Sequence, residues 1–180
     1  MTIKDMKQRV YRLIEELSTT DTIKLTDDPD LAAKINTSIN IVQNELARIK
    51  KIPKITTKTV TEGETMLITD IASDVYQLNR ISGVTFDLVQ NEITFLEGGT
   101  AKFYYYAYPT QIDSETADTT VLDLSTDALE IMPFGVAGDI LKADVSTNYG
   151  AVYSNRYNEL KQGLDARNNA GSIEFEEVEL

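Results

Sequence analysis

Residues 97–109 have the sequence EGGTAKFYYYAYP, and this stretch indicates the fold more directly than any other part of the chain. The adjacent glycines at 98 and 99 permit positive φ, so they predict a hairpin turn before a strand. Its tyrosines can pack, form an interface, or stack on bases or sugars, and the few basic neighbours favour packing or an interface. Since successive side chains of a strand point to opposite faces, we expect Tyr104, Tyr106 and Tyr108 on one face and Phe103 and Tyr105 on the other.

A two-residue period extends outward from this strand over residues 55–112. The run TTKTVT at 56–61 is poor helix material and good strand material because its residues are mostly β-branched. Turn-forming residues interrupt this stretch repeatedly, as at 62–64, 82–83, 90–92 and 97–100. The pattern predicts five or six short strands in a small antiparallel sheet or sandwich.

Two helical patterns precede the strands. Thr2 and Asp5 have the spacing of a capping box at the start of the first helix. The second opens at Asp27-Asp28-Pro29, where the proline is preset for a first helical turn. The expected buried positions are Ile3, Met6, Val10, Leu13 and Leu17 in the first helix, and Leu31, Ile35, Ile39, Val42, Leu46 and Ile49 in the second.

A separate row on the second helix consists of Asn36, Asn40 and Asn44, spaced four residues apart. Such a row either hydrogen-bonds to another helix or subunit or simply faces water. We take it as a candidate inter-subunit surface.

Two further helices are expected after the strands. Ser125 caps the first of them, and Pro133 should either kink it or mark its true start. Gly135 and Gly138 leave a flat strip where another backbone can approach closely, and we take them as candidate inter-subunit contacts. The last helix runs from about residue 147 to 167, with Tyr149, Val152, Tyr153, Tyr157, Leu160 and Leu164 on one side.

These elements define an α+β fold in a single domain of 180 residues: a bundle of about four helices with an inserted antiparallel β-sheet or small sandwich. The expected parts are N-terminal helices at 1–54, a β-rich insertion at 55–112, an acidic loop at 113–124, C-terminal helices at 125–170 and an acidic tail at 171–180.

The composition excludes most catalytic chemistry. The chain contains no cysteine and no histidine, so thiolate nucleophiles, cysteine–zinc sites, histidine bases and histidine metal ligands are all excluded. The acidic cluster at 27–30 is explained by helix capping, and the carboxylates of 113–123 lack regular ligand spacing. We expect no enzyme activity, no cofactor and no metal site.

Net charge and hydropathy limit the kinds of partner that the protein is expected to bind. With 17 basic and 29 acidic residues the net charge is -12, and an acidic surface resists non-specific binding to nucleic acid. No apolar run approaches the ~18 residues that a membrane span needs, and no signal-peptide core follows Met1, so we expect a soluble protein that acts where it is made.

The order of motifs resembles that of the head–tail connector, or adaptor, proteins of tailed bacteriophages. The resemblance covers residues 2–167 and includes the first helix and the Asn-rich second helix. Its most specific parts are Tyr104-Tyr105-Tyr106-Ala107-Tyr108-Pro109, then Val121-Leu122-Asp123-Leu124, Met132-Pro133-Phe134-Gly135-Val136-Ala137 and Asn155-Arg156-Tyr157-Asn158-Glu159-Leu160. Gly135 and Gly138 supply more glycine than such a helix usually contains.

The resemblance implies a structural virion protein of the neck, assembled in the host cytoplasm as a ring of commonly twelve copies beneath the portal. Its partners would be itself, the portal protein, and a stopper or tail-completion protein, while DNA passes through the bore without being read. The tail can add an edge strand to the portal or a neighbouring subunit, or remain a disordered acidic segment. The candidate portal-docking residues are Arg156, Tyr157, Ile173, Phe175, Val178 and Leu180.

Three alternatives stay open. The chain can be a different neck ring, such as a stopper or tail terminator. It can instead be a protein- or carbohydrate-binding module that uses the β region as a platform. A small hydrolase with paired carboxylates is the third, although no pair is evident in the order of residues.

Overall fold

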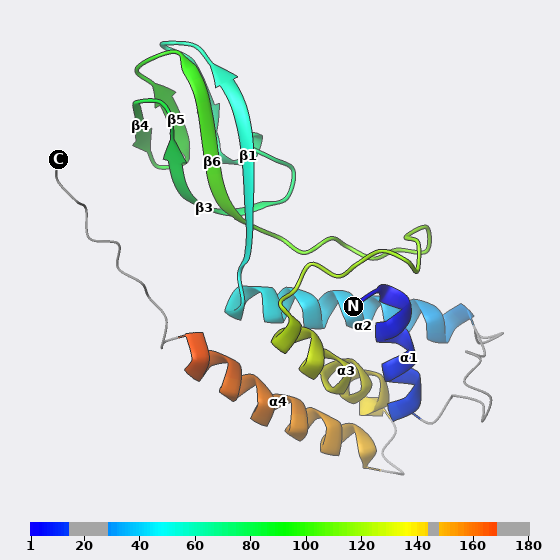
Figure 1. The fold of residues 1–180 in the computed structure, drawn as a ribbon. Helices are drawn as coiled ribbons and strands as arrows, with labels where there is room; N and C mark the ends of the chain where they lie inside the picture. The colour runs from blue at the N-terminus through cyan, green and yellow to red at the C-terminus, as the bar shows by residue number, and fades with distance from the viewer. Residues whose placement is uncertain (15–28, 144–147, 169–180) are drawn as a thin grey trace. The chain divides into compact units, whose positions relative to one another are not determined.

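The computed structural model describes residues 1–14, 29–143 and 148–168, and it confirms the α+β class (Figure 1). Its four helices and two antiparallel sheets belong to two compact units. One, the helical unit, consists of residues 1–50 and 111–180, and the other, the β unit, of residues 51–110. The β-rich part therefore begins before the predicted residue 55, since its first strand starts at Ile52.

The first two helices follow the predicted patterns. Helix α1 (Ile3–Leu13) begins with the expected capping box, in which the Thr2 hydroxyl accepts from the Asp5 amide at 3.1 Å and the Asp5 carboxylate accepts from the Thr2 amide at 2.9 Å. Helix α2 (Pro29–Ile49) starts at the predicted proline. Its buried stripe includes Ile35, Ile39, Val42 and Leu46. The predicted Leu17, Asp27 and Asp28 lie outside the described residues.

Helix α3 (Thr126–Ile140) is the centre of the helical unit, in contact with α1, α2 and α4 (Tyr149–Asn168). A helix packed on three sides needs apolar residues all round, and nine of its residues are buried: Ala128, Leu129, Ile131, Met132, Pro133, Gly135, Val136, Ala137 and Gly138. The suggestion that Pro133 marks the helix start is wrong, because α3 begins seven residues earlier and continues through the proline.

A single-turn 3-10 helix (Leu141–Ala143) follows α3. The predicted apolar side of α4 holds only in part. Tyr157 and Leu164 are buried, but Tyr149 is 51% exposed and Val152 is 55% exposed. The sequence pattern merged two faces of α4 because apolar residues lie on both.

The β unit contains two three-stranded antiparallel sheets (Figure 1). The first has the order β1–β6–β3, from β1 (Ile52–Val60), β6 (Gly99–Ala107) and β3 (Val75–Ser82). The second has the order β2–β5–β4, from β2 (Thr65–Leu67), β5 (Glu92–Phe95) and β4 (Phe86–Val89), with a 3-10 turn at Ile68–Asp70. In β6 the predicted alternation is confirmed: Ala101, Phe103, Tyr105 and Ala107 are buried.

The predicted hairpin at Gly98-Gly99 is wrong. Strands β5 and β6 belong to different sheets, so the glycines carry the chain between sheets rather than around a hairpin. Neither glycine has a positive φ. The position that requires glycine is Gly83, where φ is 93° and a Cβ atom would lie 2.5 Å from the Thr100 carbonyl oxygen.

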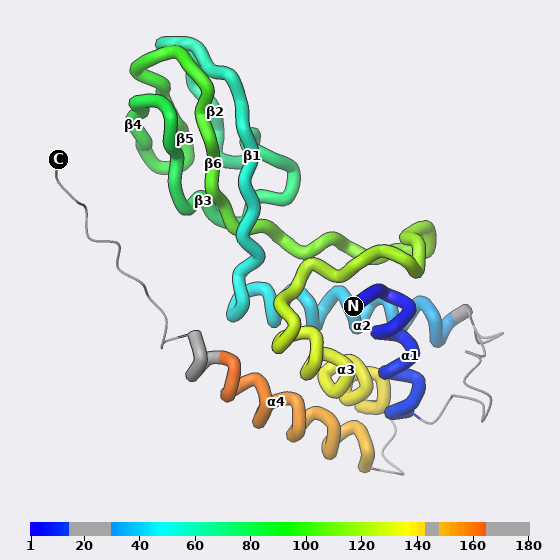
Figure 2. Tube along the Cα trace, viewed as in Figure 1, coloured from blue at the N-terminus to red at the C-terminus, as the bar shows by residue number. Residues whose placement is uncertain are grey.

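The acidic segment of residues 111–124 packs back onto the helical unit (Figure 2). Its Asp118 and Thr120 carbonyls accept hydrogen bonds from the amides of Lys4 and Ile3 at the start of α1, each at 2.9 Å. Lys7 pairs with the Asp118 carboxylate at 2.8 Å. The segment is therefore anchored at its centre while much of it stays exposed.

Candidate functional site

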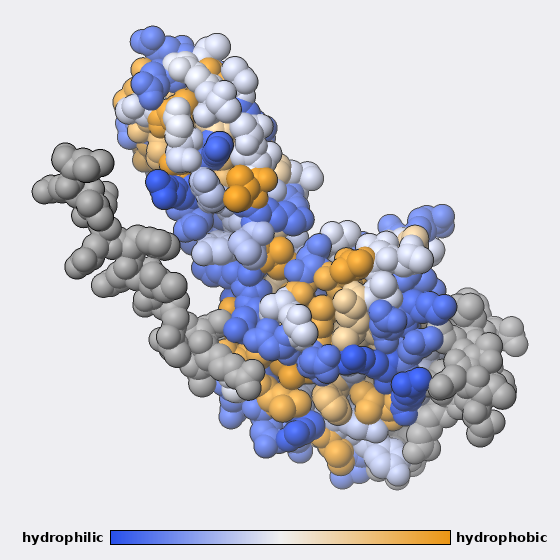
Figure 3. Space-filling model, in the orientation of Figure 1, coloured by the Kyte–Doolittle hydropathy of each residue, from blue (hydrophilic) through white to orange (hydrophobic). Residues whose placement is uncertain are grey.

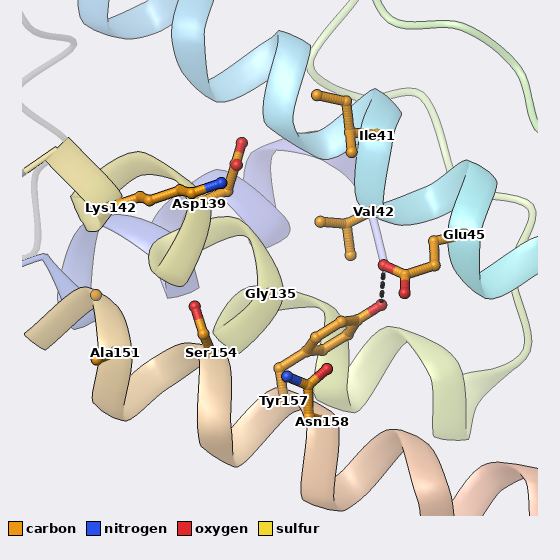
Figure 4. A pocket seen from close by; sticks show the side chains of 11 residues that line it. Ile41, Val42, Glu45, Gly135, Asp139, Lys142, Ala151, Ser154, Tyr157 and Asn158 are labelled. Atoms are coloured by element: carbon orange, nitrogen blue, oxygen red, sulfur yellow. Dashed lines mark hydrogen bonds between the residues drawn. The ribbon is translucent and has the colours of Figure 1, made fainter.

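Helices α2, α3 and α4 enclose a groove of about 360 Å³ in the helical unit (Figure 4). Ile41 stands on its α2 side and is 55% exposed, whereas Ala151, Ser154 and Asn158 come from α4. Figure 3 shows apolar patches interrupting the polar surface over the helices. An exposed large hydrophobic beside a groove marks a surface that another protein can cover.

Of the two glycines in the predicted strip, Gly135 lines this groove, and Gly138 lies one turn later on α3. A Cβ atom at Gly135 would lie 3.0 Å from the Tyr157 ring, and one at Gly138 would lie 2.9 Å from the Ser154 backbone nitrogen. The close approach predicted from the two glycines is real, but α4 of the same chain makes it. The space assigned to a second subunit is thus occupied within the chain.

Tyr157 forms one end of the groove and is only 6% exposed. Its hydroxyl donates to Glu45 Oε2 at 3.0 Å, and Lys161 Nζ binds Glu45 Oε1 at 2.5 Å. Burial raises the pKa of the Tyr157 hydroxyl far above its usual range, and the neighbouring negative charge of Glu45 raises it further. This tyrosine therefore ties α4 to α2 and stays protonated.

Tyr157→Phe should lower the free energy of unfolding by about 2 kcal/mol at pH 8, because the charged Glu45 loses a donor. The native pKa of Tyr157 lies above its unfolded value of 10.0, so its contribution is complete below pH 10 and is lost as the pH rises further. The difference between wild type and variant should then shrink by about 1.4 kcal/mol per pH unit above pH 10. Urea unfolding between pH 8 and 11.5 measures it, and a pH-independent difference would contradict the role given to this hydroxyl.

The asparagine row binds the helical unit's own chain. Asn40 donates to the Ile112 carbonyl at 2.8 Å and accepts from the Ile112 amide at 2.9 Å. Asn36 makes a longer contact of 3.4 Å with the Asp113 carbonyl, and Asn44 donates to the Asn40 carbonyl at 2.8 Å. Neither option that the sequence left open describes the row. Asn36 and Asn40 bind the loop after the β unit of the same chain, not another helix or subunit, and the three asparagines are half-buried rather than facing water.

The candidate portal-docking residues separate into three groups. Tyr157 faces inward, as described above. Arg156 lies on the outer face of α4, where it is exposed and pairs with Glu159 at 2.8 Å. The remaining residues, Ile173, Phe175, Val178 and Leu180, lie outside the described residues.

Two residues that the sequence analysis placed with the apolar side of α4, Tyr149 and Val152, instead lie on its exposed outer face. Tyr149, Val152 and Arg156 have i, i+3, i+7 spacing and share one exposed stripe. We name this stripe the α4 outer face. The sequence did contain a signal for this face, because apolar residues occur on two sides of α4. The sequence analysis grouped both sides into one apolar stripe.

The carboxylates of the described residues do not gather into a metal-binding group. Across residues 1–14, 29–143 and 148–168, no group of three carboxylates is arranged to hold a metal ion. None of the helices in these ranges is long and apolar enough to cross a membrane. Asp30 lies in the first turn of α2, where a carboxylate suits the helix dipole.

No protein-family model matches the chain, and no match is found among the curated proteins.

Proposed function

We propose that this protein is a structural subunit of a tailed-bacteriophage neck, a head–tail connector that assembles as a ring beneath the portal. The ring would join the portal to a stopper or tail-completion protein and let DNA pass through its bore. The proposal rests on the resemblance of residues 2–167 to that family and on surfaces that suit assembly. It assigns no chemical reaction to the protein.

The observation that carries the proposal is the α4 outer face. Two large apolar side chains, Tyr149 and Val152, are each about half exposed one turn apart on a helix whose opposite side is already packed on α3. Burying such a pair contributes about 1.5–3 kcal/mol per side chain. A second copy or the portal is the partner that the proposal assigns to this surface.

Charge agrees with passive passage of DNA. Since the net charge is -12, a ring of such subunits would repel DNA phosphates rather than grip them. The genome would neither be held nor be read during ejection.

The test is the particle mass of the purified protein, alone and mixed with the portal protein of the same phage. We expect a ring in the presence of the portal, and Val152→Glu should prevent assembly without changing the melting temperature, because Val152 is exposed. Gln162→Glu adds the same charge at another exposed position of α4 and should assemble normally. A wild-type protein that stays monomeric beside the portal would refute the proposal.

A further inference from the structure

The β1–β6–β3 sheet has one outward face that is rich in tyrosine. Tyr104 is paired with Ile55 on β1 and Arg80 on β3, and Tyr106 is paired with Pro53 and Gln77. At the end of the strand the rings of Tyr76 and Tyr108 meet edge to face, with centroids 5.1 Å apart. We name this surface the tyrosine face.

Three cations border the tyrosine face. Lys51 Nζ lies 4.7 Å from the centre of the Tyr106 ring and donates to Gln77 Oε1 at 2.9 Å. Arg80 and Lys102 are exposed, and no carboxylate of the described residues pairs with either. The expectation of few basic neighbours is therefore wrong, because strand pairing collects cations that are distant in sequence.

The three strands contain four basic residues and no Asp or Glu. Two of the four, Arg80 and Lys102, border the tyrosine face. The other two have partners: Lys54 pairs with Asp74 at 2.8 Å, and Lys58 donates to the Asp70 carbonyl at 2.5 Å. In a protein of net charge -12, this sheet is a local positive surface. Tyrosine and arginine with an exposed isoleucine are the composition of a protein–protein interface centre.

Complementary chemistry lies on the helical unit of the same chain. Residues 1–50 and 111–180 contain 12 basic and 22 acidic residues, a balance of -10. Within them, the segment 113–121 exposes the carboxylates of Asp113 and Glu115 together with the apolar Val121. Thr116 and the Glu115 amide hold the Asp113 carboxylate at 2.6 and 3.0 Å, so part of this segment is already ordered.

We infer that the tyrosine face of one copy binds the acidic segment 113–121 of a second copy. This inference rests on the proposed ring and names one interface within it. The contact joins two different surfaces, so it is head-to-tail and can propagate around a ring. Lys51, Arg80 and Lys102 supply the charge complementarity, and Ile55 and the tyrosines supply apolar area for Val121.

A second copy fits this face better than a nucleic acid. Long-range repulsion from a body of charge -12 opposes a second copy as well as a polyanion. The second copy, however, offers an ordered acidic segment together with the exposed apolar Val121, which can pack against Ile55 and the tyrosines. Nucleic acid is accordingly an outcome of the test that would count against the inference.

The experiment exchanges charge between the two surfaces. Variant one carries Arg80→Glu and Lys102→Glu, and variant two carries Asp113→Lys and Glu115→Lys. Each alone should self-associate roughly 10- to 100-fold more weakly than wild type, because like charges then face each other. An equimolar mixture should recover assembly, since each reversed surface meets a complementary one only on the other variant.

Sedimentation measures the assembly, under whichever condition assembles the wild type, with or without portal. The control Lys34→Glu, Arg48→Glu makes the same charge change at exposed positions of α2 and should behave as wild type. Loss without recovery on mixing would show that the two surfaces do not bind each other between copies and would overturn the inference. Unchanged assembly of variant one would also overturn the inference. A third contrary result is that the wild type binds a single-stranded oligonucleotide, and that variant one loses this binding but still assembles. In the unchanged case the proposed ring stands, whereas a wild type that assembles under neither condition refutes the ring itself.

Discussion

Replacing Asn40 with alanine is expected to lower the free energy of unfolding by about 2–4 kcal/mol. The Asn40 side chain pairs both backbone groups of Ile112 and also accepts from Gln43 Nε2 at 2.9 Å. Gln43 is only 1% exposed and Ile112 is buried, so water cannot replace these bonds freely. The loss of several partners in one substitution makes this a large effect for a residue on a helix surface.

Asn36→Ala is the matched control, one turn earlier on α2. Asn36 makes a single contact of 3.4 Å to an exposed carbonyl, and its Oδ1 is buried without a partner among the described residues. We expect a change within about 0.5 kcal/mol. Urea unfolding of both variants gives the comparison, and equal losses would mean that Asn40 does not anchor the segment after the β unit.

Gly138→Ala is expected to destabilise the helical unit by roughly 1–3 kcal/mol. Alanine is the better helix former, by about 1 kcal/mol. The added Cβ would however lie 2.9 Å from the Ser154 nitrogen and 3.2 Å from its Cα. Because these are backbone atoms, α3 and α4 must separate, and the packing loss should exceed the gain in propensity.

Gly163→Ala tests this balance with the same substitution on α4. Nothing lies within 4 Å of a Cβ atom there, so only the helix propensity changes, and we expect a gain of about 0.5–1 kcal/mol. Opposite signs for the two variants, from thermal or urea unfolding, would confirm that close α3–α4 contact requires Gly138. A stabilised Gly138→Ala would contradict that packing.

The two substitutions also bear on the proposed assembly, because Asn40 and Gly138 hold the assembly surfaces in place. The bond from Asn40 holds the start of the acidic segment on α2, and the glycine contact seats α4 on α3. Both surfaces that we assign to assembly, the α4 outer face and segment 113–121, depend on these anchors. Variants at Asn40 or Gly138 should therefore impair assembly only through stability, unlike Val152→Glu.

Local patterns predicted most of the elements. The Thr2–Asp5 capping box, the proline start of α2 and the alternation of β6 were read correctly because each depends on residues within one or two turns or along one strand. The two-residue period likewise located the β unit to within a few residues. Which strands pair with each other was predicted less well. The adjacent glycines at 98 and 99 suit a hairpin, yet the chain crosses there to another sheet.

The candidate sites were predicted less well, because a residue type indicates that a partner is needed but not which partner. Gly135 and Gly138 predicted that another backbone approaches α3 closely, and Asn40 predicted a hydrogen bond from α2. In the structure these partners are Tyr157, Ser154 and Ile112 of the same chain. Since these residues are occupied within the chain, our proposal assigns the inter-subunit contact to the exposed α4 outer face instead.

The amino-acid order alone determined the α+β class, the starts of α1 and α2, and the absence of cysteine and histidine chemistry, because these follow from short-range spacing and composition. Only the tertiary structure decided that Lys51, Arg80 and Lys102 border one tyrosine face. Those residues are separated by more than 20 positions each, and they meet because β1 and β3 pair with opposite edges of β6. Pairing between distant strands depends on the whole unit's packing, which no local window of sequence contains.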